Sequence, residues 1–301
     1  MTVLITGGTV FLSRHFAEYF IKRGDTVYVL NRGTHAQPVG AHAVIADRNE
    51  LECALRGLHF DAVIDVNAYN KQHISSLLDA TDGFEKYILI SSSAVYPDTA
   101  VQPFTEETPR GKNAVWGDYG LNKIEAEDEL IRRVPDAYII RPPYIYGEYN
   151  NVYREAFVFD CAEKGLPFYL PRDGGMKLQF IHAEDVCRFA EVLLTASPKQ
   201  TVFNVGCEPV TVREWAEACY AAVGKKPLFK HVDGGIEQRA YFPFYVYEYA
   251  LDVTRMNKLM PRTIGLYEGL LRAYKQYSEN RSQVTPKTYL QFIEKNLSHA
   301  E

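Results

Sequence analysis

The fold is decided by the first fifteen residues, Met1-Thr-Val-Leu-Ile-Thr-Gly-Gly-Thr-Val-Phe-Leu-Ser-Arg-His15. Thr2–Ile5 is a short apolar run rich in β-branched residues, which is typical of a buried strand. A turn at Gly7 and Gly8 follows, and from Val10 the apolar residues recur with helical spacing. A strand that passes through a glycine turn into a helix points the first N–H groups of that helix at whatever lies above the turn. The usual occupant is the pyrophosphate of a dinucleotide.

The next residues complete a strand-helix-strand unit. Gly24 is expected to end the helix, and Thr26–Leu30 reads as a second buried strand. The glycine pattern is altered, because a G-x-x-G-x-x-G spacing that starts at Gly7 meets Val10 and Ser13 at its later positions. Two interpretations therefore stay open at this point: a dinucleotide-binding turn, and an α/β turn that binds no ligand.

Composition sets the class of protein. The 301 residues include 47% hydrophobic and 24% charged residues, as in ordinary globular proteins. A net charge of −5 argues against a general nucleic-acid binder. No apolar run approaches the roughly 20 residues of a membrane span, and the opening strand leaves no room for a cleavable signal. The five cysteines form no C-x-x-C pair, so we expect core thiols, no metal site and a reduced, cytoplasmic setting.

The first half alternates strands and helices with short connections. Further strands are expected at 43–46, 61–66, 87–90 and 137–140, and helices at Glu50–Arg56, Gln72–Ala80 and Tyr119–Arg133. Strands that are apolar along their whole length are covered on both faces. The sequence therefore predicts an α/β fold with a doubly wound, mostly parallel sheet of the Rossmann type.

After Pro143 the rhythm changes. Helices are expected at 150–165, 184–194, 211–223, 251–259, 266–277 and 287–297, and strands at 177–182 and 202–205. We expect residues 1–145 to form the dinucleotide-binding domain, with 176–206 returning to it. Residues 146–175 and 207–301 would form a smaller mixed lobe, and the cleft between the two parts would hold the substrate.

Tyr119 and Lys123 carry the sharpest chemical signal. Residues four apart on a helix share one face. A phenol has a pKa near 10, and a neighbouring ammonium or nicotinamide cation favours its ionised form. Such a tyrosine exchanges a proton with an alcohol or a carbonyl while hydride moves to or from a cofactor. The alternative is a surface pair on an amphipathic helix, because this spacing is common by chance.

Five segments together resemble a known family. They are Ser91-Ser-Ser-Ala-Val-Tyr96, Tyr119-Gly-Leu-Asn-Lys123, Arg141-Pro-Pro-Tyr-Ile-Tyr-Gly147, Phe180-Ile-His-Ala-Glu-Asp-Val186 and Phe203-Asn-Val-Gly206. The set is similar to the extended short-chain dehydrogenase/reductases, the NAD(P)-dependent epimerase/dehydratase group. The resemblance covers the chain to about Gly224. None of the segments specifies a substrate.

The resemblance implies catalytic roles. Tyr119 would be the general acid/base, and Lys123 would tune its pKa and bind the cofactor ribose. Ser92 would orient the reacting oxygen, with Ser93 as the fallback because three serines adjoin. For His182 and Asp185 the favoured interpretation is structural, as polar anchors of a strand–helix junction.

The resemblance also implies a cofactor site. Its expected residues are Gly7, Gly8, Thr9, Val10, Phe11 and Leu12 at the turn, Asp47 and Arg48 near the adenine, Val66, Asn67 and Ala68 beside the ribose and phosphates, Tyr119 and Lys123, and Pro142, Tyr144 and Ile145 along the nicotinamide.

Cofactor preference is read from the end of the second strand. An NAD-preferring site places an acidic residue there, and this chain has Asn31 and Arg32. Arg32 offers a cation suited to a 2′-phosphate, with Arg14 and Arg48 near enough to add charge. The sequence therefore predicts NADP(H) over NAD(H), the alternative being that Arg32 is a solvent-facing loop residue.

The substrate and partners come from the resemblance alone. It implies a sugar or nucleotide sugar as substrate, and a homodimer through helices Gln72–Ala80 and Tyr119–Arg133. One departure is that Leu178-Gln179 stands where the group carries an Arg–Asp pair. The rival is a non-catalytic nucleotide-binding or RNA-binding protein on the same fold, since the chloroplast RNA-binding branch shares the altered turn. The acidic charge disfavours that rival.

Overall fold

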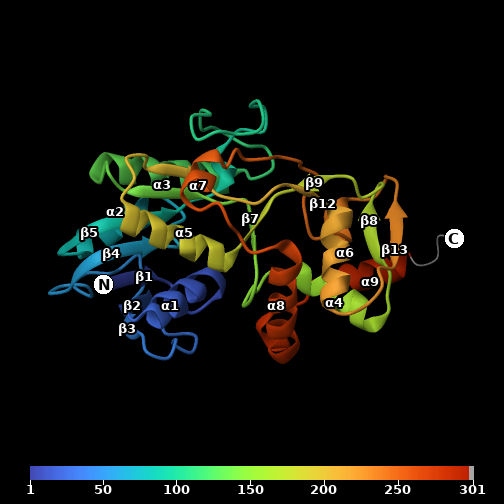
Figure 1. Cartoon of the computed structure of the whole chain (residues 1–301), viewed down its shortest axis with the longest axis horizontal. Helices are drawn as coiled ribbons and strands as arrows, with labels where there is room; N and C mark the ends of the chain where they lie inside the picture. The colour runs from blue at the N-terminus through green and yellow to red at the C-terminus, as the bar shows by residue number, and fades with distance from the viewer. Residues whose placement is uncertain (298–301) are drawn as a thin grey trace.

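The computed structural model of the protein describes residues 1–297. A seven-stranded sheet forms the centre of its N-terminal half (Figure 1). The strand order is β11-β6-β5-β4-β1-β2-β3. The strands are β1 (Thr2–Thr6), β2 (Thr26–Asn31), β3 (His42–Ile45), β4 (His59–Asp65), β5 (Gly83–Ile90), β6 (Tyr138–Arg141) and β11 (Val202–Asn204). Every neighbouring pair in this sheet is parallel, which confirms the predicted doubly wound architecture.

Helices cover both faces of the sheet (Figure 1). They are α1 (Phe11–Arg23) and α5 (Ala183–Ala196) on one face, and α2 (Lys71–Ala80) and α3 (Asp118–Arg133) on the other. Because side chains alternate along a strand, Val3 and Ile5 enter the core that contains α1, whereas Leu4 enters the core that contains α2. The continuous apolar run of β1 thus serves two cores.

The second lobe lies beyond the carboxyl ends of the strands and holds the C-terminus (Figure 1). Its elements are α4 (Glu155–Lys164), β8 (Phe168–Pro171), α6 (Val212–Ala222), β13 (Phe229–Val232), η2 (Gln238–Ala240), α8 (Leu266–Glu279), η3 (Arg281–Gln283) and α9 (Tyr289–Asn296). Between the lobes, β7 (Tyr144–Tyr146) pairs with β10 (Phe180–His182), and β9 (Lys177–Leu178) pairs with β12 (Val210–Thr211). The short helices η1 (Ser93–Val95) and α7 (Thr254–Leu259) lie beside the sheet.

Local signals explain where several helices begin and end. Gly24 ends α1 with φ 93, a conformation that glycine adopts without cost. Thr211 and Glu214 form a complete capping box at the start of α6. The helix expected at Glu50–Arg56 is wrong, because this segment forms turns in which Glu52 has φ 43. Leu51 and Leu55 are nevertheless buried, so their helix-like spacing reflects burial.

Other boundaries also moved. The helix expected from residue 150 begins at Glu155, and those expected from 251 and 287 begin at Thr254 and Tyr289. The strand expected at 177–182 is two short strands separated by Gln179. The pairing of β8 with β13 was not predicted, because these strands are short and lie 60 residues apart.

Membrane-spanning helices, cysteines and metal sites were sought among the described residues. No helix within residues 1–297 combines the length and apolarity needed to cross a membrane. The five cysteines are free thiols, of which Cys53 is exposed, and no group of three or more histidine, cysteine or acidic residues in this part of the chain is arranged to hold a metal ion.

Candidate active site

A cavity of about 660 Å³ lies at the carboxyl edge of the sheet, above β1 and its neighbour β4. The strand order reverses between these two strands, and ligands of open α/β sheets bind in the crevice at such a switch point. Most residues predicted for the site line this cavity: Gly7, Thr9, Val10, Phe11, Leu12, Asn31, Arg32, Asp47, Arg48, Val66, Asn67, Ser92, Tyr119, Lys123, Pro142 and Ile145.

Three predicted residues are not in the lining. Gly8 packs on β2, where an added Cβ would meet Val29 at 2.4 Å. Ala68 is fully buried, and its carbonyl accepts a hydrogen bond from Lys123. Tyr144 packs instead between the ring of Trp116, just before α3, and the ring of Phe244 in the second lobe.

Part of the cavity lining was not predicted from the sequence. The cavity includes Ser13, Leu30, Thr34, His35, Ala46, Asn49, Tyr69, His73, Ile90, Ser91, Pro143, Asn151 and Val152. Tyr69 and His73 follow the predicted strand end at Asn67, so their neighbourhood was a usable signal. Asn151 and Val152 reach the cavity only because the second lobe folds back over the sheet, and no local pattern marks them.

The glycine turn presents a free helix terminus to the cavity. Gly7 and Gly8 have φ 90 and 83, and an added Cβ on Gly7 would meet Ser13 Oγ at 2.8 Å. The N-cap of α1, Val10, provides no side-chain acceptor, and the first turn has no acidic residue. The next residue, Phe11, has φ 40, so strain is stored where the glycine pattern is altered. The first N–H groups of α1 thus remain available to an anion, and the site fits the pyrophosphate of a dinucleotide.

Only one of the three adjoining serines faces Tyr119. Ser91 donates to Glu127 at 2.5 Å, and Ser93 shares a hydrogen bond of 3.0 Å with Tyr249. Ser92 caps η1 through the amide of Ala94, and its hydroxyl lies close enough to Tyr119 to lower the pKa of that phenol. This arrangement favours Ser92 over the fallback Ser93.

Lys123 is fixed beneath the cavity by two backbone carbonyls. Its Nζ donates to Ala68 at 2.7 Å and to Ile90 at 2.9 Å, and its side chain is 2% exposed. Burial disfavours the ammonium and lowers the pKa of Lys123 to about 8, against the opposing effect of the carboxylates of Asp65 and Glu127.

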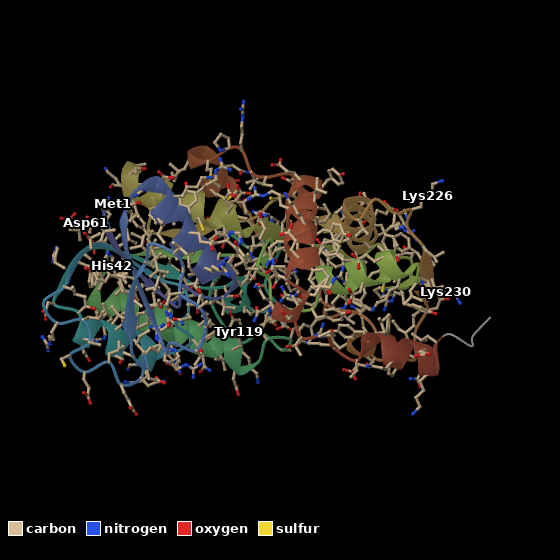
Figure 2. All side chains as sticks on the ribbon, turned by 90° about the horizontal axis from the view of Figure 1, so that it is seen from below. Met1, His42, Asp61, Tyr119, Lys226 and Lys230 are labelled. Atoms are coloured by element: carbon tan, nitrogen blue, oxygen red, sulfur yellow. The ribbon has the colours of Figure 1, made fainter. Side chains whose placement is uncertain are left out.

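The pKa of Tyr119 differs from the expectation. Its side chain is 40% exposed, and Figure 2 shows it near the middle of the molecule's long axis. Burial of the hydroxyl raises the pKa of Tyr119 above its ordinary value, while the nearby hydroxyl of Ser92 and the charge of Arg154 oppose that rise. Lys123 directs its ammonium at two carbonyls and is not among the groups that act on this pKa, whereas the sequence suggested that it would lower it. A bound cationic nicotinamide would act in the lowering direction.

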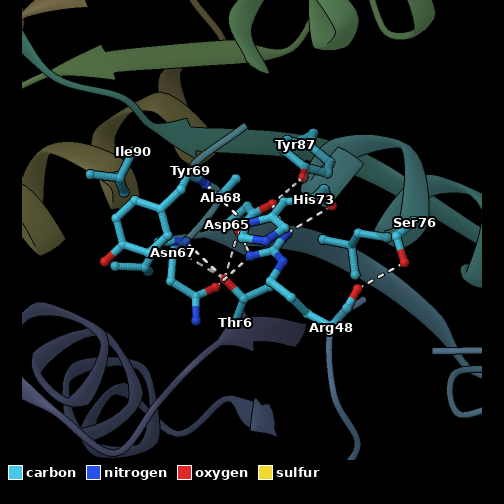
Figure 3. Close-up of polar contacts among 12 residues, drawn as sticks. Thr6, Arg48, Asp65, Asn67, Ala68, Tyr69, His73, Ser76, Tyr87 and Ile90 are labelled. Carbon is cyan, nitrogen blue, oxygen red and sulfur yellow. Dashed lines mark hydrogen bonds and ion pairs between the residues drawn. The ribbon is translucent and has the colours of Figure 1, made fainter. Parts of the chain in front are cut away.

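Arg48 takes part in a buried polar network beside the cavity (Figure 3). Its guanidinium forms two hydrogen bonds with Asp65, at 2.9 and 2.8 Å, and another with Asn67 Oδ1 at 2.5 Å. Asp65 is fully buried and also accepts from Thr6 and Tyr87. The guanidinium and these donors hold the pKa of Asp65 below its usual range despite burial. The charge of Arg48 is therefore neutralised inside the protein.

The end of β2 is polar and partly paired. Asn31 donates to the carbonyl of Gly7 at 2.9 Å and exchanges hydrogen bonds with Gln37. Arg32 is exposed at the cavity and lies near Asp47, whose pKa is lowered mainly by its hydrogen bonds with Asn49 and further by the charge of Arg32.

Arg14 was expected to add charge at the end of β2, but its guanidinium lies elsewhere. Its guanidinium pairs with Glu18 at 2.7 Å and lies over the ring of Tyr149, at 4.1 Å from the centroid. Of the two arginines that line the cavity, Arg48 is paired, and Arg32 forms no ion pair with a described residue. Arg14 is paired with Glu18 outside the lining.

The structural interpretation of His182 and Asp185 is confirmed. His182 is fully buried and caps α5 by accepting from the amide of Glu184. Asp185 accepts from the amide of Ile264 and pairs with Arg188 at 2.7 Å. Both residues hold the junction between β10, α5 and the later chain.

Comparisons with solved structures show the same fold. A dTDP-glucose 4,6-dehydratase from Bacillus anthracis, in complex with NAD, superposes with a TM-score of 0.75 at 20% identity and covers 94% of this chain and 98% of its own. A UDP-glucose 4-epimerase from Thermotoga maritima, with UDP-glucose, also has a TM-score of 0.75, at 19% identity, and covers 93% of this chain and all of its own.

Comparisons of the sequence identify relatives and a family. A chloroplast stem-loop binding protein of 41 kDa from Arabidopsis thaliana is 26% identical, over 90% of this chain and 78% of its own length. A dTDP-4-dehydro-6-deoxy-D-allose reductase from a Streptomyces species is 25% identical, over 74% of this chain and 82% of its own length. The profile of the NAD dependent epimerase/dehydratase family matches residues 3–206. This protein therefore belongs to the NAD dependent epimerase/dehydratase family, on the extended short-chain dehydrogenase/reductase fold.

Proposed function

We propose that the protein is an NAD(P)-dependent epimerase, dehydratase or reductase that acts on a sugar or nucleotide sugar, with Tyr119 as the general acid/base. The observation that carries the proposal is the arrangement at the cavity edge. The hydroxyl of Tyr119 meets Ser92, and the ammonium of Lys123 is fixed one helical turn away. A protein that only binds a nucleotide has no need of all three groups in one place.

Each group has a defined task in this proposal. The bound nicotinamide supplies hydride transfer. Tyr119 exchanges a proton with the oxygen of the reacting substrate carbon, and Ser92 holds that oxygen by a hydrogen bond. Lys123 binds the cofactor ribose and keeps a positive charge beneath the site. The helix terminus at Val10 and the amides that follow it hold the cofactor phosphates.

We infer a preference for NADP(H) over NAD(H). The end of β2 presents the neutral Asn31 and the exposed Arg32, so this strand end has no acidic residue that would repel a 2′-phosphate. The inference rests on Arg32 alone, because Arg48 is paired with Asp65 and Arg14 with Glu18. The solved relatives named above include an NAD complex, so titrating both cofactors is the decisive measurement.

The test of function uses a panel of nucleotide sugars and their 4-keto derivatives. Turnover is followed by product analysis and by oxidation of the reduced cofactor. An epimerase returns hydride to the same substrate and retains its nucleotide, whereas a reductase exchanges it each cycle. Assay of nucleotide released on denaturation separates these cases. We lean toward a retained nucleotide, and a protein free of nucleotide that oxidises cofactor stoichiometrically with a carbonyl substrate would assign it as a reductase.

A second candidate is RNA binding without catalysis, which the printed name of the Arabidopsis relative supports. The net charge of −5 opposes it, because binding to a phosphate backbone depends on clustered cations. Titration of a stem-loop RNA at two salt concentrations tests it. Micromolar affinity with a steep salt dependence, together with no turnover across the panel, would favour RNA binding.

The homodimer through α2 and α3 is also a proposal. These helices pack against each other, and α3 exposes Leu121 and Ile131. Light scattering during gel filtration measures the mass directly. A single species near 34 kDa at micromolar concentration would contradict the dimer.

A further inference from the structure

The two edges of the seven-stranded sheet differ in how their backbone groups are satisfied. β11 forms one edge and β3 the other. At β11, the outward amide of Asn204 donates to the carboxylate of Glu106 at 2.9 Å. Arg255 donates to the outward carbonyl of Val202 at 3.4 Å, and α7 packs beside the strand. Side chains and a helix therefore cover this edge, which is how proteins commonly prevent a sheet from adding another strand.

The edge at β3 has no such cover. Ile45 is paired with Asn31 of β2, and the amide of Ala46 donates to the carbonyl of Asn31 at 3.0 Å. Backbone groups alternate in direction along a strand, so those of Ala43 and Ile45 point away from β2. Within residues 1–297, no hydrogen bond to these outward groups is present. β3 thus presents the free N–H and C=O groups of both residues to an additional strand.

The side chains of this edge are apolar and uncharged. Ile45 is 58% exposed, Ala43 is exposed and Val44 is half-buried. Val39, in the loop that leads into β3, is 96% exposed. Residues 33–46 contain no lysine, arginine, aspartate or glutamate, although 24% of the chain is charged. Open edges are usually protected by a lysine, a proline or a bulge, and β3 has no charge, no proline and an unbroken register with β2. The strand is therefore suited to pair with another chain.

A second copy of the same strand fits this edge. In an antiparallel pair centred on Val44, Ala43 lies opposite Ile45 of the second copy, and the outward groups of these residues hydrogen bond to each other. The two-fold axis brings Val44 against Val44 of the second copy, as a pair without hydrogen bonds whose Cα atoms are about 4.5 Å apart. A two-fold axis also brings each nearby charge close to its own equivalent. Because residues 33–46 carry none, two copies of this segment approach without repulsion.

The edge is accessible from outside the molecule. Figure 1 shows β3 at the border of the sheet beside β2. Figure 2 shows His42, the first residue of β3, at the end of the molecule opposite Lys226 and Lys230 of the second lobe. A second chain can therefore reach β3 without displacing that lobe. After β3 the chain continues into Ala46 and Asp47, which line the cavity, so a partner at this edge would lie next to the proposed cofactor site.

We propose that β3 is an interface between two copies of this chain, joined by antiparallel pairing into one continuous sheet. This surface is distinct from the surface of α2 and α3, and it does not depend on the proposed function. The paired segment is four residues long, and so small an interface gives weak association. We expect a dissociation constant of about 10–500 μM.

Disulfide cross-linking tests the register. Val44→Cys is made in a Cys53→Ser background, because Cys53 is exposed. Across the two-fold axis the introduced thiols face each other at a separation that a disulfide spans, so mild oxidation should give a covalent dimer of twice 34.3 kDa. Ile45→Cys is the matched control. Its side chain is more exposed, but its two copies are out of register by two residues, beyond the Cα separation of about 7 Å that a disulfide allows. It should cross-link about tenfold more slowly.

Sedimentation equilibrium tests the association itself. Leu121→Lys is introduced first, because it places a charge on the other proposed interface, at α3. In this background the average mass should rise from 34.3 kDa toward twice that value as the concentration approaches about 0.5 mM. Adding Ala43→Lys puts a cation on each side of the axis and should keep the mass at one chain. Its melting temperature should stay unchanged, because Ala43 is exposed and its backbone groups do not bond to β2. Val101→Lys, at a residue that is 88% exposed in another loop, adds the same charge and should leave the association intact.

Three results would overturn the proposal. They are a mass of one chain at every concentration when Leu121→Lys is the only change, an association that Ala43→Lys does not weaken, and cross-linking of Ile45→Cys as fast as that of Val44→Cys. The proposed function fails separately, because Tyr119→Phe should remove turnover and leave this association unchanged.

Discussion

Two sets of charged residues, one in each half of the molecule, differ in whether they form ion pairs. In the N-terminal half, Arg48 is paired with Asp65, and Glu127 lies between Arg110 and Arg141, at 3.0 and 2.6 Å. Both carboxylates are fully buried and accept further hydrogen bonds. These buried charges are paired within the protein, and the pairs connect the ends of the strands to each other and to α3.

The second lobe pairs Arg281 with Asp160 and Glu163, but Arg154, Arg239 and Lys287 form no ion pair with a described residue. Arg154 and Arg239 both lie near the unpaired hydroxyl of Tyr144, and Lys287 lies within the field of the two arginines. Paired charges thus maintain the architecture around β4 and α3, whereas Arg154, Arg239 and Lys287 add no ion pair to the second lobe. Four experiments test this contrast, beginning with the one that should change the protein most.

The largest effect is expected from Asp65→Asn. It leaves the guanidinium of Arg48 buried without its counter-charge, and breaking a buried pair in this way costs about 3–5 kcal/mol of unfolding free energy. Urea unfolding followed by circular dichroism measures it. Arg154→Gln in the second lobe is the matched comparison and should lose nothing. If both variants lose similar stability, the two kinds of charge are not different.

The second effect concerns catalysis. Tyr119→Phe removes the proton-transfer group, and turnover should fall about a hundredfold or more while cofactor affinity stays nearly unchanged. Lys123→Ala should weaken both, since its ammonium is fixed by the carbonyls of Ala68 and Ile90 beneath the cavity. Steady-state kinetics and cofactor titration provide the readouts. Full activity of Tyr119→Phe on an identified substrate would refute the acid/base assignment.

The third effect is smaller and concerns the cofactor. Wild type should prefer NADP(H) by about tenfold, or roughly 1.4 kcal/mol, and Arg32→Ala should erase most of that preference without changing NAD(H) affinity. Arg48 serves as the internal comparison, because its charge is already paired with Asp65. Tighter binding of NAD(H) by the wild type would show that an exposed Arg32 is only a loop residue.

The smallest effect is a dependence of cofactor affinity on pH. Since burial lowers the pKa of Lys123 to about 8, a requirement for its ammonium predicts an affinity loss of about twofold between pH 7 and 8 and a steeper loss above. The unfolded state binds more protons between pH 8 and the ordinary lysine pKa near 10.4, so folding stability rises over that range while affinity falls. Lys123→Arg keeps its charge, and its affinity profile should be flat. A flat profile in the wild type would contradict the role of the ammonium.

Much of the first half could be predicted because its signals are local. The apolar runs of β1, β2 and β4 and the glycines that punctuate them fix a parallel sheet, and the strand ends then bring distant residues to one edge. Most of the expected cofactor residues line the cavity for this reason. The segment Glu50–Arg56 misled the prediction, because Leu51 and Leu55 are buried by a series of turns.

The direction of side chains could not be predicted in the same way. Ser91, Ser92 and Ser93 are equivalent in sequence, and only the packing of α3 and the second lobe against them gives each a separate partner. Arg48 and Arg32 both follow strand ends, yet one is paired inside the protein and the other is exposed. The sequence placed Tyr144 along the cofactor, whereas its ring lies in the second lobe.

The sequence by itself determined the fold class, the family and the residues that share the carboxyl edge of the sheet, because hydrophobic period and turn chemistry act between near neighbours in the chain. Which charged side chains are left without an ion pair follows from the folded structure and not from the sequence. Arg154, Arg239 and Lys287 lie up to 133 residues apart in the chain and occur in no motif. Their repulsion exists only once the second lobe has folded, because electrostatic interaction depends on distance in space.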